Sequence, residues 1–298
     1  MKPIVLSMID DEALTEELLL CAKEHHPEVE WVLPDNPLAR QAKVAACWHP
    51  PSATLSDFPQ LECLYSVGAG IDNLGPLLNA PVQINRIIDD GQKEGMFEYV
   101  LWGILYYQRD MDKYHQDNQL KQWNPLPQRS MQNIKVGILG LGELGGYVGE
   151  KLAVMGYQVS GWSRTKKHIE GINSYSGQDA LPELLGELDI LVNLLPLNPE
   201  TKGILNLELL ANLPSKAALI HCGRGDHLVE DALEELFNNN RLRGAIVDVF
   251  STEPLPKESN LMAMDKVFVT PHIASSASNE SIVAQVSQTA IKIKGTVM

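Results

Sequence analysis

The chain has 298 residues, of which 44% are hydrophobic and 21% charged, proportions that are ordinary for a folded globular protein. Its length exceeds the roughly 100–200 residues of one domain, so we expect two. The formal net charge of −14 argues against nucleic acid or an anionic membrane as a partner, because phosphates bind clustered cations. No apolar run approaches the roughly 18 residues that cross a bilayer.

The N-terminal part alternates short apolar runs with a helical pattern. Strands are expected at 3–8, 44–48 and 61–66, and a helix at 12–25. Strands that alternate with helices predict a parallel sheet. Residues 1–10 are interpreted as the start of the first strand rather than a signal peptide, because acids follow at once and no small-residue cleavage site is evident.

Cysteine usage points to a reducing compartment. The four cysteines are scattered without the CxxC spacing of a metal site, so we expect reduced, structural thiols, no metal and a cytoplasmic protein; they are Cys21, Cys47, Cys63 and Cys222.

A long helical pattern runs from about Met96 to Gln119, with apolar residues on one broad face. Trp123 follows in a segment that holds Pro125 and Pro127, which end the helix and extend the chain.

A second alternating series fills the rest of the chain. Six strands are expected, at 134–139, 158–162, 190–194, 217–221, 244–248 and 267–269, with a final helix at 279–294. Six strands with helices between them fit a complete doubly wound nucleotide-binding domain.

The first strand of this series is followed by a glycine pattern, Gly140-Leu141-Gly142-Glu143-Leu144-Gly145. Gly140 permits a tight turn, Gly142 lets backbone approach a pyrophosphate, and Gly145 allows a helix to pack on the sheet. Such a pattern alone also fits a merely structural turn, but the strand before it and the helix after it favour dinucleotide binding.

The end of the next strand bears on the choice of cofactor. An acid there would bond a ribose 2′-hydroxyl, but the sequence has Ser163, Arg164 and Thr165, followed by two lysines. Because an arginine fork fits a 2′-phosphate, this loop predicts NADPH in preference to NADH. The alternative is an ordinary solvated basic loop.

Three further strand ends carry an arginine, a carboxylate and a histidine. Arg224 lies between two glycines, Glu253 follows the fifth expected strand of this series, and His272 follows the sixth. An arginine holds a carboxylate and polarises a carbonyl, while a histidine beside a carboxylate donates a proton near neutral pH. These are the groups needed to reduce a 2-oxo acid.

In this order the glycine loop and the trio resemble the D-2-hydroxyacid dehydrogenase family, and within it the bacterial glyoxylate/hydroxypyruvate reductases. Stretches such as Trp48-His49-Pro50-Pro51 and Gly161-Trp162-Ser163-Arg164 add to the likeness, which covers nearly the whole chain. We therefore expect an α/β protein with two doubly wound parallel-sheet domains of Rossmann-like type. Residues 1–98 would form a flavodoxin-like substrate-binding domain and 99–270 a dinucleotide-binding domain, with 271–298 returning to the first.

The resemblance also implies roles for single residues. Arg224 would engage the carboxylate and carbonyl of the substrate, His272 would donate the proton, and Glu253 would hold His272. Further substrate contacts would come from Trp48, Gly68, Ala69, Gly70 and Trp123, and further cofactor contacts from Leu195, Pro196, Cys222 and Asp248. Each tryptophan also fits an ordinary core or interface position.

The chain departs from the family pattern beside Arg224. His221 and Gly223 stand where an asparagine and an alanine or serine are common, which leaves the geometry behind Arg224 open.

The function implied is the NADPH-dependent reduction of a small 2-oxo acid, glyoxylate or hydroxypyruvate, to glycolate or D-glycerate. The alternatives are a D-2-hydroxyacid dehydrogenase with another acid, and a non-catalytic NAD(P)-sensing protein on the same scaffold. The resemblance also implies a homodimer through the helix at 96–119, with Trp123 reaching the pocket of the partner.

Overall fold

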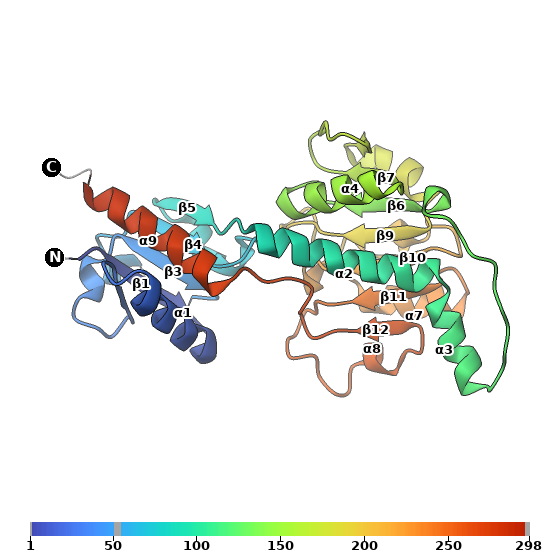
Figure 1. Cartoon of the computed structure of the whole chain (residues 1–298), viewed down its shortest axis with the longest axis horizontal. Helices are drawn as coiled ribbons and strands as arrows, with labels where there is room; N and C mark the ends of the chain where they lie inside the picture. The colour runs from blue at the N-terminus through green and yellow to red at the C-terminus, as the bar shows by residue number, and fades with distance from the viewer. Residues whose placement is uncertain (1, 51–54, 296–298) are drawn as a thin grey trace. The chain divides into compact units, whose positions relative to one another are not determined.

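The computed structural model of the chain describes residues 2–50 and 55–295, which fall into two compact units (Figure 1). Unit 1 comprises residues 1–92 and 276–298, and unit 2 comprises residues 93–275. The boundaries expected from the sequence were 98/99 and 270/271. The two units of the structure divide at 92/93 and 275/276, because Met96 and Ala274 lie in a hydrophobic cluster of unit 2.

Unit 1 is built on a five-stranded parallel sheet. The strands are β1 (Ile4–Ile9), β2 (Glu30–Val32), β3 (Val44–Trp48), β4 (Cys63–Ser66) and β5 (Gln83–Arg86), in the order β2-β1-β3-β4-β5. This is the flavodoxin-like order, as expected. The sequence did not indicate β2, which has three residues, or β5, whose residues are only partly buried or exposed, because neither produces a clear apolar run.

Helices cover one face of this sheet. Helix α1 (Glu12–His25) begins after Asp11, whose side chain caps the amide of Leu14. Helix α9 (Asn279–Gly295) packs beside α1, and both contribute to one hydrophobic cluster with the sheet. The C-terminal segment therefore belongs to the core of unit 1. The described part of the other face carries the short helices η1 (Ala39–Gln41), η2 (Leu55–Asp57) and η3 (Asp72–Asn79).

Unit 2 has a seven-stranded parallel sheet. Its strands are β6 (Lys135–Leu139), β7 (Gln158–Trp162), β8 (Ile172–Tyr175), β9 (Ile190–Asn193), β10 (Ala218–His221), β11 (Gly244–Val247) and β12 (Val267–Val269). The strand order is β12-β11-β10-β9-β6-β7-β8, so successive strands are added first on one side of β6 and then on the other. This order is typical of doubly wound dinucleotide-binding domains. The six expected strands are present, and the edge strand β8, which is short and partly exposed, is the one the sequence did not show.

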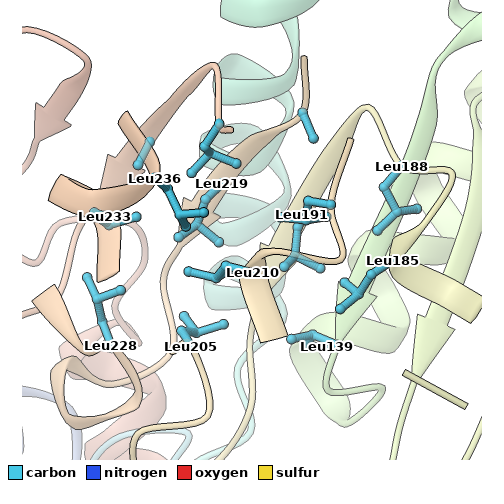
Figure 2. Packing of buried hydrophobic residues seen from close by; sticks show 14 of the residues in the cluster. Leu139, Leu185, Leu188, Leu191, Leu205, Leu210, Leu219, Leu228, Leu233 and Leu236 are labelled. Carbon is cyan, nitrogen blue, oxygen red and sulfur yellow. The ribbon is translucent and has the colours of Figure 1, made fainter. Parts of the chain in front are cut away.

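Helices lie on both faces of this sheet. Helices α2 (Asp90–Gln108) and α4 (Glu143–Met155) pack on one face, and α5 (Leu181–Leu185), α6 (Leu207–Leu210), α7 (Glu230–Asn238) and α8 (Asn260–Ala263) on the other. Side chains alternate between the two layers along each strand, so Leu191 joins one cluster and Ile190 and Val192 the other. Figure 2 shows the leucine-rich layer, in which Leu205 and Leu228 lie below Leu210.

The expectation of a single long helix at 96–119 is wrong. The structure has α2 and a separate helix α3 (Met111–Gln119), because Asp110 adopts a left-handed conformation with φ of 57°. Asp110 accepts hydrogen bonds from Arg243 at 2.7 Å and Lys113 at 2.8 Å. The ion pair with Arg243, distant in sequence, holds the break. No helix within residues 2–50 and 55–295 is long and apolar enough to span a membrane.

Candidate active site

Three strands of unit 2 end at one edge of the sheet and carry the expected trio. Arg224 follows β10, Glu253 follows β11, and His272 follows β12. Because β10, β11 and β12 are neighbouring parallel strands, their carboxyl ends meet at the same edge. Ligands of doubly wound proteins bind at this edge, so the position suits catalysis.

Glu253 and His272 form an ion pair. Oε2 of Glu253 lies 2.7 Å from Nδ1 of His272, and Oε1 accepts a hydrogen bond of 2.9 Å from the amide of Phe250. Both carboxylate oxygens of Glu253 are thus engaged. The pair fixes the ring of His272, since Nδ1 bears the proton that Glu253 accepts and Nε2 remains for a ligand.

The ion pair shifts the pKa values of both residues. The hydrogen bond that His272 donates to Glu253 raises the pKa of His272, against the effect of partial burial and of the Arg224 charge. Partial burial acts to raise the pKa of Glu253, but the hydrogen bonds from His272 and Phe250 outweigh it, and the net pKa is lowered. His272 is therefore held in its proton-donating form to a higher pH than a free histidine.

Asp248 holds the loop that presents His272. Its fully buried carboxylate accepts hydrogen bonds from the hydroxyl of Thr270 at 2.5 Å and from the amides of Ile273 and Ala274, both at 2.9 Å. The backbone of His272, which adopts a positive φ of 54°, donates to the carbonyl of Asp248. The sequence led us to expect Asp248 as a cofactor contact, and it did not indicate this second role because most of the partners are backbone groups.

Gly225 brings the turn of Arg224 against the segment that carries Glu253. A Cβ atom on Gly225 would lie 1.8 Å from the carbonyl carbon of Phe250, so only glycine fits there. The amide of Phe250 donates to Glu253. The Arg224 turn and the Glu253–His272 pair are thus linked by one close backbone contact.

Buried polar side chains lie beneath the Arg224 turn. Asn193, His221 and His227 are each fully buried and hydrogen-bonded to one another through Asn193. The amide of Arg224 donates to Nδ1 of His227 at 3.1 Å. This network defines the geometry beside Arg224, which the unusual residues His221 and Gly223 had left open in the sequence. The sequence did not indicate a role for Asn193 or His227, because no local pattern links positions so far apart.

The glycine loop has the geometry of a dinucleotide cradle. Gly140 has φ of 101°, and a Cβ on Gly145 would lie 1.8 Å from the carbonyl oxygen of Gly140, so the first turn of α4 packs directly on the loop. Open space lies where a Cβ of Gly142 would stand. Gly142 is the N-cap of α4, and free backbone amides at a helix N-terminus bind phosphate. The residues therefore fit a dinucleotide.

A cavity of about 720 Å³ adjoins this loop within unit 2. Many of the expected cofactor residues line it: Gly140, Leu141, Gly142, Ser163, Arg164, Thr165, Leu195 and Pro196. The expected residues Glu143, Leu144, Gly145, Cys222 and Asp248 are not among its lining. The cavity is also lined by Asn198, Thr201 and Ile204, which the sequence did not indicate because their loop has no glycine pattern or charge run.

The basic loop after β7 faces the same cavity. Arg164 and Lys167 are exposed lining residues, whereas Lys166 does not line the cavity. Ser163 donates to the carbonyl of Thr165 at 2.8 Å, which shapes the turn. No acid lies between Trp162 and Lys167, so this end of the cavity presents cations and hydroxyl groups.

Unit 1 brings together two of the expected substrate contacts. The ring of Trp48 packs over Gly68, where a Cβ atom would lie 2.8 Å from Cζ3 of the indole. Ser66 donates to the carbonyl of Gly70 at 2.5 Å, and Asn73 donates to Ser66 at 2.7 Å, so the Gly68-Ala69-Gly70 turn is held from below. Pro51, part of the resemblance near Trp48, lies outside the described residues.

Trp123 lies in the segment after α3. Its side chain is 93% exposed, far more than is usual for tryptophan. Apolar side chains are also exposed on and near α2 and α3, and they include Trp102, Leu105, Met111 and Phe268. Trp102 and Phe268 pack edge to face at 5.3 Å between ring centroids.

Comparisons with known proteins show which family this chain belongs to. Residues 101–274 match the family described as D-isomer specific 2-hydroxyacid dehydrogenase, NAD binding domain. Glyoxylate/hydroxypyruvate reductase A of Escherichia fergusonii is 39% identical over 267 residues, which cover 87% of this chain and 84% of that protein.

Solved structures extend the similarity to the whole chain. A D-isomer specific 2-hydroxyacid dehydrogenase family protein from Klebsiella pneumoniae 342 is 38% identical with a TM-score of 0.93, covering 99% of this chain and 95% of its own. The NADPH-dependent glyoxylate/hydroxypyruvate reductase of Sinorhizobium meliloti, solved with NADP and sulfate, is 32% identical with a TM-score of 0.89, covering 100% and 96%.

Fold, glycine cradle and matches together define an oxidoreductase that uses a nicotinamide dinucleotide. The chain belongs to the D-isomer specific 2-hydroxyacid dehydrogenase family, as its sequence indicated. It is an NAD(P)-dependent enzyme that acts on a small-molecule substrate.

Proposed function

We propose that this enzyme reduces glyoxylate, hydroxypyruvate or a similarly small 2-oxo acid, with NADPH as the preferred reductant. The observation that carries the proposal is the meeting of Arg224, Glu253 and His272 at the edge of the sheet that also bears the cofactor cradle. Similarity to reductases named for glyoxylate and hydroxypyruvate supports the choice of substrate class.

Arg224 binds and polarises the substrate in this proposal. Its guanidinium presents parallel N–H groups that match a carboxylate and the adjacent carbonyl oxygen. One of its nitrogens, Nη1, already donates to the carbonyl of Gly223 at 2.9 Å, which restrains the side chain. A cation here also opposes the unfavourable field that a net charge of −14 exerts on an anionic substrate.

His272 is the proton donor. The glycine loop and the Arg164 end of the cavity would hold NADPH, which when bound would supply a hydride to C2 of the oxo acid. As charge develops on the carbonyl oxygen, the Nε2 proton of His272 moves to it, and the hydroxy acid results. Glu253 stabilises the protonated ring before the transfer and keeps Nδ1 hydrogen-bonded throughout.

The preference for NADPH rests on the loop after β7. Arg164 and Lys167 supply positive charge at the cavity wall, and the loop offers no carboxylate to bond the 2′-hydroxyl of NADH. The NADP-bound reductase of Sinorhizobium meliloti supports this choice.

The preference for small acids rests on unit 1. The indole of Trp48 lies over the Gly68 turn, whose backbone amides suit an anion, and its bulk disfavours a large substrate side chain. We assign unit 1 to substrate binding and unit 2 to the cofactor, the same division of roles that the sequence suggested for residues 1–98 with 271–298 and for residues 99–270.

A homodimer completes the proposal. The exposed apolar side chains on α2, on α3 and at Phe268 form a surface that a two-fold partner would bury. The exposed Trp123 lies on the chain directly after this surface, where it suits a role in the pocket of the partner subunit.

Steady-state kinetics test the substrate and cofactor together. Glyoxylate, hydroxypyruvate, pyruvate and phenylpyruvate are each assayed with NADPH and with NADH. The highest kcat/KM is expected for glyoxylate or hydroxypyruvate with NADPH. A preference for phenylpyruvate would contradict the assignment of substrate size, and a preference for NADH would contradict the role of Arg164.

A further inference from the structure

We propose that His227 is a positioning residue, which orients the backbone of Arg224 through a buried network with Asn193 and His221. The inference deepens the proposed function, because it rests on the assignment of Arg224 to the substrate carboxylate.

The network joins two strand ends and a turn. Asn193 ends β9 and His221 ends β10, and the two residues are direct partners in the parallel register. His227 ends the short helix η6 (Gly225–His227) that follows Arg224. Nδ2 of Asn193 lies 3.1 Å from Nδ1 of His221 and 3.0 Å from Nδ1 of His227. All three side chains are fully buried.

The partners of Asn193 define which groups around it donate a hydrogen bond and which accept one. The amide N–H of Arg224 donates to Nδ1 of His227 at 3.1 Å, so this nitrogen is an acceptor. Asn193 must therefore present its NH₂ group to His227, and the same group makes Nδ1 of His221 an acceptor as well. The amide of Leu195 reaches the carbonyl oxygen of Asn193 at 3.4 Å, which agrees with this orientation.

Both imidazoles are consequently neutral and carry their proton on Nε2. Burial supports this state, because desolvation lowers the pKa of His221 to about 3. A protonated His227 would place an N–H against the N–H of Arg224 and against the NH₂ of Asn193. The arrangement thus depends on one tautomer of each ring.

His227 holds Arg224 on both sides of its backbone. Its Nδ1 accepts from the Arg224 amide, and its own amide donates to the Arg224 carbonyl at 2.9 Å. His227 is anchored in turn, because its carbonyl accepts from Leu205 at 2.8 Å, and Leu228 pairs with Leu205 in the leucine layer of Figure 2. The position of the Arg224 backbone, from which the side chain starts, therefore depends on the position of His227.

Gly223 makes the close packing possible. A Cβ atom at this position would lie 2.8 Å from both Nδ2 of Asn193 and Nδ1 of His227. An alanine or serine, common at this position in the family, would push into the network. The departure at residue 223 and the two buried histidines thus form one arrangement.

Stability alone is a poor explanation for the network. Within the described part of the chain, Nε2 of His221 is buried without a hydrogen-bond partner. A buried N–H that lacks an acceptor is unfavourable, so apolar side chains would fill the same space at less cost. The network supplies instead a defined acceptor for the Arg224 amide.

The test compares two substitutions of His227 in the full-length enzyme. His227→Phe keeps the ring shape and removes the acceptor, whereas His227→Asn places a carbonyl oxygen near the position of Nδ1 and retains it. Kinetics with glyoxylate and NADPH are measured with inhibition by oxalate, an unreactive dicarboxylate that reports anion binding without chemistry. His25→Phe and His25→Asn, at the exposed end of α1, are the matched controls.

His227→Phe is expected to raise KM for the oxo acid and the inhibition constant of oxalate about tenfold or more, with the Kd of NADPH unchanged, because a small displacement of a binding group is costly. His227→Asn is expected to recover most of this loss, and the His25 variants to resemble the wild type. A His227→Phe variant that melts earlier but binds oxalate normally, or equal losses in both His227 variants, would overturn the proposal.

Nuclear magnetic resonance of histidine-labelled wild-type enzyme tests the network without any substitution. Two histidines are expected as neutral Nε2–H tautomers, and His227→Phe removes one of them. An Nδ1–H tautomer for this signal would overturn the proposal. Arg224→Ala separates the two claims: if it leaves oxalate inhibition unchanged, the proposed function of Arg224 fails, whereas a loss in Arg224→Ala with none in His227→Phe refutes the positioning role alone.

Discussion

Nδ1 of His272 lies 2.7 Å from Oε2 of Glu253, although the two residues come from loops that follow different strands. The second carboxylate oxygen is taken by the amide of Phe250, at 2.9 Å, and the Phe250 backbone also packs against Gly225. The proton donor is therefore fixed by the same segment that touches the arginine turn. The proposed roles of these residues give separate expectations for activity, stability, cofactor choice and assembly.

The first expectation concerns proton donation. His272→Ala should lower kcat by about 10²–10⁴, while the Kd of NADPH changes little, because the donor acts in the transition state. Glu253→Gln should move the alkaline limb of the reduction profile to lower pH, since Glu253 raises the pKa of His272. Rate profiles against pH for wild type and both variants check this. An alkaline limb at the same pH in Glu253→Gln would refute the functional pairing.

The same pair should make stability depend on pH. The pKa of Glu253 is lowered in the folded state, so its contribution is present above about pH 4.3 and is lost as pH falls through the folded value. The pKa of His272 is raised, so its contribution is complete below about pH 6.5 and is lost as pH rises through the folded value.

Glu253→Gln should therefore destabilise the protein most between about pH 4.3 and 6.5. The loss should be about 1 kcal/mol or less, because each side chain is 35% exposed and solvent screens the pair. Urea unfolding of wild type and variant across this range measures it. A difference that does not vary with pH would show that the ion pair is not its cause.

The third expectation concerns the cofactor. Arg164→Ala should weaken NADPH by about 1.5–3 kcal/mol and NADH much less, because the charged hydrogen bond is made only to the 2′-phosphate. Lys166→Ala is the matched control, since it removes the same charge from the same loop but from a residue that does not line the cavity. Michaelis constants for both cofactors decide the point. Equal losses for NADPH and NADH would remove Arg164 from the specificity role.

The fourth expectation concerns the loop of His272. Asp248→Asn should lower both stability and kcat, because an amide replaces a buried carboxylate that accepts from Thr270, Ile273 and Ala274. A loss of about 1.5–3 kcal/mol fits a hydrogen bond to a charged group. Thr270→Val removes one of these donors only and should cost less. Thermal melting and kcat are measured side by side, and a normal kcat in Asp248→Asn would show that the loop keeps its shape without the carboxylate.

The last expectation concerns assembly. A dimer should be seen by light scattering at micromolar concentration, and Trp123→Ala should raise KM for the oxo acid without dissociating it, because one rim residue seldom carries an interface. Mixing inactive Arg224→Ala with Trp123→Ala gives a sharper test. If Trp123 acts in the pocket of the partner, each mixed dimer should contain one site with normal KM. A fully active monomer, or mixtures that keep the raised KM, would contradict the role in the partner's pocket.

The sequence by itself determined the fold class, the family and the chemistry on offer. The glycine pattern 140–145 joins a strand to the start of a helix, and Arg224, Glu253 and His272 each follow an apolar strand. The periodicity of apolar residues and the order of the motifs along the chain were therefore enough to place these residues. The fold and the family are confirmed, whereas the roles of these residues stay predictions.

The tertiary structure alone decided features that depend on partners distant in the chain. The break between α2 and α3 follows from the ion pair of Asp110 with Arg243, and the edge strands β2, β5 and β8 gain their structure from a neighbouring strand rather than from their own pattern. The acceptor for the Arg224 amide requires Asn193 and His227 to meet. Local periodicity reports only which face of an element is buried, and it carries no information on which buried polar groups face one another.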